Sequence, residues 1–178
     1  RWESPYARPE FGQRHKTLAR INRTQVYTPQ FFISGRALSA WRDSASGLDA
    51  AIRSVQNQSA RAEIQLTIDN SRSDILSVTA RANSPLTATP LALYLALTEK
   101  GLSNKIDAGE NQGAVLRHDH VVREWWGPLT LKNGVLHIQQ AVALQPNWRR
   151  NQLTVVGFVQ NSVTGEVLQA LSSAACTL

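Results

Sequence analysis

The sequence predicts an α+β protein that is mostly β, in which a helix, a short hairpin and a second helix precede an antiparallel β-sandwich. Three observations support this fold class. Residues 9–22 show helical periodicity in their apolar positions. After Arg61 the apolar residues instead alternate with polar ones, as in strands with one buried face. Finally, Asn133-Gly134 separates two alternating runs, and this dipeptide suits a two-residue hairpin turn.

The first unit is expected to contain two helices and one hairpin. Pro9 suits the first turn of a helix because it lacks the N–H that would have no partner there. Pro29 stands at the start of a β-rich run, where no ladder donor is lost. The predicted elements are a helix over Pro9–Asn22, a strand over Val26–Ile33, a turn at Ser34-Gly35, a return strand over Ala37–Trp41, and a helix over Leu48–Val55 capped by Ser46.

The second unit is expected to contain about eight strands separated by turn residues, which is typical of a sandwich. The Asn133-Gly134 hairpin, with its turn exposed at the tip, is the clearest element. Ser162–Glu166 forms a second, looser hairpin. The predicted strands are Ile64–Asp69, Ile75–Ala82, Leu91–Thr98, Val115–Trp125, Leu129–Lys132, Val135–Leu144, Leu153–Gln160 and Val167–Leu171.

The change of period and a polar run near residues 58–60 predict a boundary between units 1–59 and 60–178. A hairpin with two helices buries little apolar surface, so the first unit must dock on the sandwich or be completed by upstream residues. The chain starts with neither Met nor a signal sequence, and we favour the second account, in which an upstream segment has been removed.

Composition narrows the function only slightly. The net charge is +6, and basic residues are densest in the first helix. Aromatic residues are not interleaved with them as base stacking would need, so we interpret them as a solvated helix face and expect no nucleic-acid partner. No apolar run reaches the roughly 18 residues of a membrane span. The basic stretch in and just after the first helix consists of Arg14, His15, Lys16, Arg20 and Arg23.

Cys176 is the one cysteine, so this chain cannot close an internal disulfide. Its role is left open between an inert thiol, a reactive thiol and a partner for a cysteine in a missing segment. No cofactor is predicted. His118 and His120 share a strand face, with His137 as a conceivable third metal ligand, but hydrogen-bonded or surface histidines are favoured and no metal site is predicted. Neither a nucleophile elbow nor a phosphate-binding loop is present.

Trp125-Trp126 could offer an aromatic platform for a sugar or a peptide. Adjacent strand residues point to opposite faces, however, so one of the two indoles should lie in the core. We therefore interpret the pair as packing residues.

Several motifs resemble a family of secreted bacterial proteins of unknown function. The resemblance rests on Trp2–Phe11, Val26–Gln30 and Ser34–Arg36, and it continues into Gly109–Gly113 and His120–Arg123, so it covers nearly the whole chain. In that family a thioredoxin-like domain precedes a β-sandwich. The resemblance implies that residues 1–59 are the C-terminal half of a thioredoxin-like domain. This chain departs from the pattern in lacking the first strand and the Cys-x-x-Cys helix.

The same resemblance implies that Pro29 is a cis-proline facing redox cysteines and that the backbone of Thr28 binds an extended substrate, so Thr28 and Pro29 are the predicted substrate-binding residues. No catalytic residue is predicted within the chain. Two functions follow: a periplasmic or secreted thiol oxidoreductase or thiol-handling protein whose cysteines lie outside this chain, or a non-catalytic accessory protein whose sandwich recognises an envelope component. A Cys-x-x-Cys upstream of Arg1 would distinguish them, so whether the protein is an enzyme stays open.

The hairpin should also have an inner edge that needs a partner. Phe31, Phe32 and Ile33 are consecutive, so apolar side chains project from both faces. We expect the edge to be met by an upstream segment, a second copy or the sandwich, with Thr28-Pro29 beside it.

Overall fold

A computed structural model describes residues 4–38 and 45–174. Two helices and eleven strands are assigned, and every strand pairing is antiparallel. Neither helix is long and apolar enough to cross a membrane within this described part of the chain. The elements are α1 (Pro9–Ile21), β1 (Phe31–Ile33), β2 (Arg36–Leu38), α2 (Ala45–Gln56), β3 (Glu63–Asp69), β4 (Ile75–Asn83), β5 (Leu91–Glu99), β6 (Leu102–Lys105), β7 (Val115–His118), β8 (Val121–Thr130), β9 (Val135–Ala143), a 3-10 turn (Arg150–Gln152), β10 (Leu153–Asn161) and β11 (Val167–Ala174).

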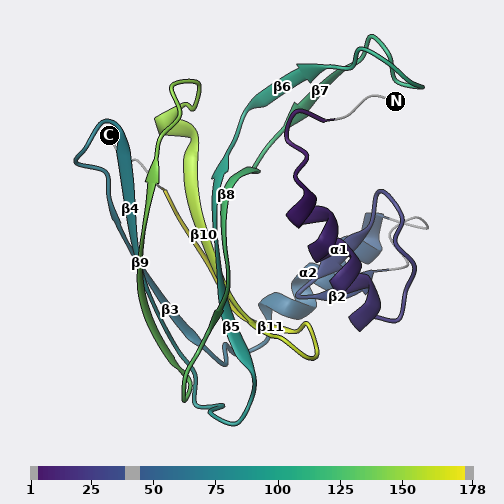
Figure 1. Cartoon of the computed structure of the whole chain (residues 1–178). Coiled ribbons are helices and arrows are strands. Elements are labelled where there is room, and N and C mark those ends of the chain that lie inside the picture. Colours follow the sequence, from purple (N-terminus) through teal and green to yellow (C-terminus); the bar gives the residue numbers. More distant parts are fainter. Residues whose placement is uncertain (1–3, 39–44, 175–178) are drawn as a thin grey trace.

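Two sheets form the larger part of the molecule (Figure 1). One has the order β11-β10-β5-β8 and the other β3-β4-β9. Their inner faces enclose one apolar core, in which Leu76 and Val78 of β4 meet Leu93 and Leu95 of β5. Strand β5 is buried along almost its whole length because it lies between two strands and is covered on both faces. The predicted antiparallel, mostly β architecture is therefore confirmed.

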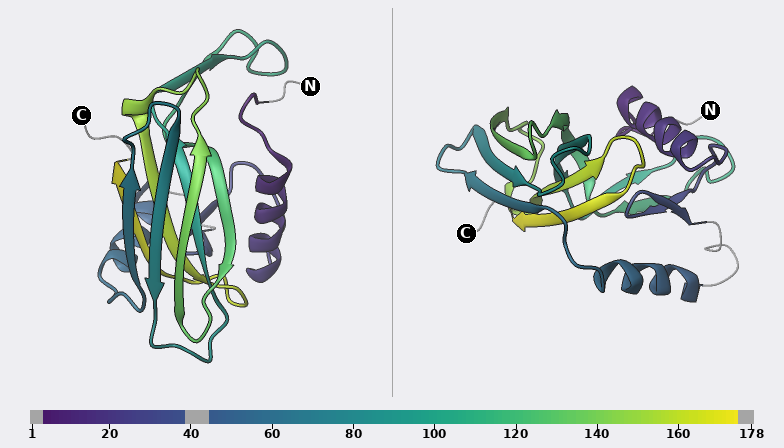
Figure 2. Two further views of the ribbon diagram at one scale, coloured as in Figure 1. Left: turned by 60° about the vertical axis from the view of Figure 1, so that its left-hand side comes forward. Right: turned by 90° about the horizontal axis from the view of Figure 1, so that it is seen from below.

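The helices and the β1–β2 hairpin lie beside the four-stranded sheet, with α1 and α2 on opposite sides of the hairpin (Figure 2). The predicted order of helix, hairpin and helix is confirmed. Strand β1 is shorter than expected, beginning at Phe31, and the expected return strand is described over Arg36–Leu38, because residues 39–41 lie outside the described residues. The second helix begins at Ala45, so Ser46 lies inside it and is not its N-cap.

The predicted strand Val115–Trp125 is wrong, because it divides into β7 and β8 at Asp119 and His120. His120 has a φ of 58°, which ends the extended conformation there. Strand β7 pairs with β6, which the sequence did not predict, in a ribbon that projects from the sandwich (Figure 1). The expected separate strand Leu129–Lys132 is wrong, because Leu129 and Thr130 are the end of β8 and Leu131 and Lys132 lie beyond it.

Asn133-Gly134 forms the expected tight turn, with φ values of 51° and 77° and reciprocal hydrogen bonds of 3.0 Å between Lys132 and Val135. The expected hairpin is wrong, because pairing stops after this one bridge and the two strands join different sheets. Gly134 is also buried. A Cβ on Gly134 would lie 2.3 Å from the carbonyl oxygen of Ser84, whose N–H donates to the Gly134 carbonyl. The turn is thus a corner between the sheets.

Candidate functional site

The predicted substrate loop lies between α1 and β1. Thr28 and Pro29 are both exposed, and the peptide bond between them is cis, as the family resemblance implied. Nearby, His15 of α1 packs edge-on against Phe32, with 5.9 Å between ring centroids, and its Nε2 lies 2.5 Å from the side-chain oxygen of Gln30. Helix α1 therefore holds the segment that follows Pro29.

The hairpin turn fixes which backbone groups face outward. Ser34 and Gly35 have φ values of 50° and 80°, the combination of a two-residue turn whose flanking pair, Ile33 and Arg36, is hydrogen-bonded. The next pair, Phe32 and Ala37, must direct its N–H and C=O groups away from the hairpin. On the β2 side Asn22 Oδ1 accepts from the Ala37 N–H at 2.8 Å. On the β1 side, no residue of the described chain bonds the backbone of Phe32.

The hairpin tip is fixed to the start of β11. The Ser34 hydroxyl donates to the Val167 carbonyl at 3.0 Å, and the Val167 N–H donates to the Ser34 carbonyl at 3.2 Å. Gly35 and Gly165 pack so closely that a Cβ on Gly35 would lie 1.7 Å from the Gly165 carbonyl oxygen. The loop of the predicted Ser162–Glu166 hairpin, which is confirmed, supplies this contact.

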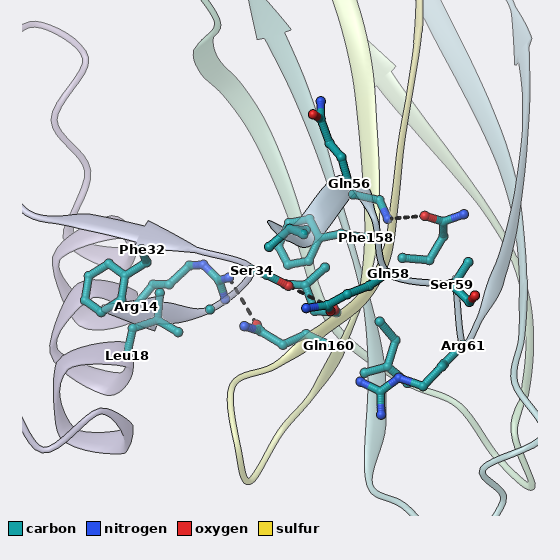
Figure 3. Close-up of a pocket in the computed structure, with 17 residues that line it drawn as sticks. Arg14, Leu18, Phe32, Ser34, Gln56, Gln58, Ser59, Arg61, Phe158 and Gln160 are labelled. Atoms are coloured by element: carbon teal, nitrogen blue, oxygen red, sulfur yellow. Dashed lines mark hydrogen bonds between the residues drawn. The ribbon is translucent and has the colours of Figure 1, made fainter. Parts of the chain in front are cut away.

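A cavity of about 520 Å³ lies between the hairpin, both helices and the β10–β11 edge (Figure 3). Its size is in the range of small-molecule sites. Apolar and polar side chains from both parts of the molecule line it, with Arg14 and Gln160 as the polar groups at its α1 side (Figure 3). Phe32 of β1 also lines it, so the cavity adjoins one face of the hairpin. The apolar wall residues include Leu18, Phe32, Val55, Phe158, Val167 and Leu168.

Arg14 links α1 to the outer face of the four-stranded sheet. Its guanidinium carbon lies 4.7, 5.0 and 5.2 Å from the ring centroids of Tyr94, Trp125 and Phe158. Its Nη2 donates to Gln160 Oε1 at 3.1 Å, and Gln160 is itself buried. Burial lowers the pKa of Arg14, and Tyr94 opposes that shift. The expectation that the basic residues form a solvated face is thus wrong for Arg14, although Lys16, Arg20 and Arg23 are exposed.

The aromatic residues of β8 divide as predicted. Trp126 packs against the core, whereas Trp125 stacks with Tyr94 and Phe158 on the opposite face. The sequence missed Arg14 and Gln160 because nothing local to either residue indicates the sheet that brings them together. Only the alternation of apolar residues along β5, β8 and β10 could have indicated that their aromatic side chains share one face of a sheet.

A buried carboxylate lies at the other end of the same sheet. Glu99 is completely buried, and its Oε2 accepts from Arg123 Nε at 2.8 Å. Its Oε1 accepts from the backbone N–H and Nε of Arg149, both at 3.1 Å. Burial alone raises the pKa of Glu99, but these hydrogen bonds from Arg149 and Arg123 outweigh it and hold the pKa below its usual value. Arg123 also stacks on Tyr6, with 5.2 Å to its ring centroid, so the network anchors the N-terminal segment.

The histidines do not converge. His118 contacts the side-chain oxygen of Asn104 and packs edge-on against Tyr6, His120 is exposed, and His137 lies on the other sheet. The described part of the chain holds no group of three or more residues arranged to bind a metal ion. Cys176 lies outside the described residues, so its role stays a prediction.

Comparison with known proteins identifies a family and a fold. The structure of HBP35 of Porphyromonas gingivalis aligns with a TM-score of 0.71 and 17% identity, over 93% of this chain and 58% of that chain. The present chain thus spans little more than half the length of that protein, and at this identity the likeness shows the fold alone.

A domain of the outer membrane lipoprotein Omp28 from the same organism aligns over 65% of this chain and 88% of that one, with 17% identity and a TM-score of 0.46, which is too low to support an inference. No protein of curated function matches the sequence. The family model described as "Protein of unknown function (DUF1223)" matches residues 1–160, so the chain belongs to the DUF1223 family.

Proposed function

We propose that this chain belongs to a thioredoxin-like, thiol-handling protein of the bacterial envelope, whose redox cysteines lie outside it. The observation that carries the proposal is the open edge of β1, where the backbone N–H and C=O of Phe32 point away from β2 and bond no residue of the described chain. A further strand on that edge would satisfy both groups.

The position of the exposed Thr28-Pro29 loop supports a role in substrate binding. The loop immediately precedes β1, so cysteines carried by a strand and helix added at the β1 edge would lie near it. The backbone of Thr28 would then pair with an extended segment of a substrate protein, as the family resemblance implies. The α1 and hairpin-tip contacts described above give that loop a fixed support.

Thiol–disulfide exchange by the full-length protein tests this function. We expect insulin reduction that depends on an upstream cysteine pair. Thr28→Arg should raise the KM for a protein disulfide substrate with little change in stability, because Thr28 is exposed. Thr67→Arg, at an exposed site of β3, is the matched control and should behave like the parent. Equal effects of the two variants would contradict a substrate role for the Thr28 loop.

The envelope location has a separate test. We expect the full-length protein in the periplasmic or secreted fraction after osmotic shock, with a cytoplasmic enzyme as the marker of leakage. A full-length protein without any thiol exchange would instead favour the non-catalytic accessory function, with the sandwich as its recognition module.

A further inference from the structure

Strand β9 is an edge strand of the three-stranded sheet. In such a strand, alternate residues direct their backbone N–H and C=O groups toward the neighbouring strand and toward the free edge. Lys132 and Val135 exchange two hydrogen bonds across the corner turn, so the Val135 backbone points away from β4. At the far end the Leu144 N–H donates to the Asp74 carbonyl, on the β4 side. Alternation between these two points directs the N–H and C=O groups of residues 137, 139, 141 and 143 to the free edge.

These four residues form a continuous hydrogen-bonding edge. No residue in the described ranges bonds the backbone of His137, Gln139, Ala141 or Ala143, and all four are exposed. The pairing of β9 with β4 runs from Ile75–Ala143 to Asn83–Val135 without a bulge. The edge therefore keeps an uninterrupted register and is long enough to accept another strand.

Strand β9 also lacks the features that usually protect an edge. It contains no charged residue and no proline, whereas β3 carries Glu63 and Asp69 at its ends. Strand β8 has two register irregularities and Pro128. The start of β11 is already bonded, because Leu168 accepts from Arg61 and Val167 pairs with Ser34. Charges, prolines, bulges and existing bonds hinder edge pairing, and β9 has none of them along its free edge, unlike β3, β8 and the start of β11.

We propose that β9 is a self-association site, at which a second copy of this chain pairs antiparallel through a two-fold axis at Gln140. In that register His137 faces Ala143 of the second copy and Gln139 faces Ala141. All four residues with free backbone groups then form hydrogen-bonded pairs, and the two three-stranded sheets become one continuous sheet.

Side chains support a second copy as the occupant. On the outer face, each larger side chain, His137 or Gln139, meets an alanine. On the inner face, Ile138 meets Val142 and Gln140 meets its own copy, whose amides can bond each other. The uncharged strand brings no like charges together, although the chain has a net charge of +6.

Cysteine cross-linking in the full-length protein tests the register. Gln140→Cys places two thiols in a non-hydrogen-bonded pair, with Cα atoms about 4.5 Å apart, inside the range of disulfides. His137→Cys is the matched control, because its two copies would be about 20 Å apart at a rise of about 3.4 Å per residue. We expect an oxidised covalent dimer from Gln140→Cys and its loss in His137→Cys. Equal cross-linking of both variants, or of neither, would overturn the proposal.

The oligomeric state supplies an independent measurement. The full-length protein should have twice the mass of one chain by light scattering after gel filtration. Gln139→Pro removes an edge N–H without removing a bond to β4, so we expect a folded monomer, whereas Gln139→Thr keeps the N–H and should stay dimeric. A monomeric parent, or a dimer that persists in a folded Gln139→Pro variant, would also overturn it. The mass measurement involves no thiol chemistry, so a monomeric parent would overturn the self-association proposal and leave the proposed function unaffected.

Discussion

The two parts of the molecule are held together in different ways. The strands from β3 onward share an apolar core, and every residue of β5 except Tyr94 is buried. Among the residues described before Arg61, by contrast, Ala19 is the only buried apolar side chain. The helices and hairpin are instead attached through Arg14 on three rings, two hydrogen bonds at Ser34 and the close packing of Gly35. The sandwich is thus stabilised by burial, and the smaller part by its contacts with the sandwich.

Truncating one leucine in each part tests this difference most directly. Leu95 is completely buried, so Leu95→Ala should lower the free energy of unfolding by about 2 to 5 kcal/mol. Leu18 is half-buried beside the cavity, and Leu18→Ala should cost about half of that or less. Urea titrations of the two variants measure both values. Equal losses would mean that the helices belong to the same core.

The buried Glu99 sharpens the comparison, because it joins the sandwich to the N-terminal segment through Arg123. Glu99→Gln leaves two arginines without their carboxylate and should cost on the order of 3 kcal/mol. Exposed Glu63 is the control, since Glu63→Gln should lower the free energy of unfolding far less than Glu99→Gln.

The same carboxylate predicts a pH dependence. Its pKa is lower in the folded protein than the usual value of about 4.3, so its contribution is complete above that value and is lost as the pH falls through the folded pKa. The stability of the parent should therefore fall more steeply in acid than that of Glu99→Gln. Parallel curves for the two proteins between pH 5 and 2 would refute this assignment.

Gly35 offers a way to separate the two parts. A methyl group there would collide with the Gly165 carbonyl, and the φ of 80° is unfavourable for any L residue. We expect Gly35→Ala to cost about 2 kcal/mol and to release the hairpin tip while the sandwich stays folded. Limited proteolysis should then cleave before Arg61 much faster than in Gly109→Ala, whose added methyl contacts nothing and whose φ is 90°. Global unfolding of Gly35→Ala would contradict the separation.

Arg14 should have a smaller effect. Arg14→Met keeps an apolar stem on the rings but removes the charge, and we expect a loss of about 1 kcal/mol. Hydrogen exchange of the α1 amides should accelerate, with Arg20→Met on the exposed face of α1 as the unchanged control. Equal exchange in both variants would show that the rings do not hold the helix.

The last prediction is that the chain alone has no thiol oxidoreductase activity. Neither part supplies a pair of thiols, so the 178-residue chain should not catalyse insulin reduction, because one thiol cannot cycle between dithiol and disulfide. Turnover that disappears in Cys176→Ala would disprove this prediction.

Local sequence patterns predicted the helices and strands of both parts, but not which of them lie next to each other in space. Alternation located the strands around Ile64, Val78 and Leu95, and the Ser34-Gly35 turn followed from its composition. The position of Arg14 and the burial of Glu99 depend on strands far away in the sequence, so no local signal could supply them. The family resemblance, not the local pattern, gave the cis bond before Pro29.

The corner at Asn133-Gly134 affects how the chain reaches this fold. A two-residue turn normally lets its flanking strands pair at once, as neighbours in sequence. Here β8 must find β5, and β9 must find β4, so that Leu93 meets Leu129 and Asn83 meets Val135. The Asn133-Gly134 turn therefore brings almost no pairing between the two strands that flank it. Those strands pair with β5 and β4 only after much longer loops have closed. Such high contact order is characteristic of slow folding, on the scale of milliseconds to seconds.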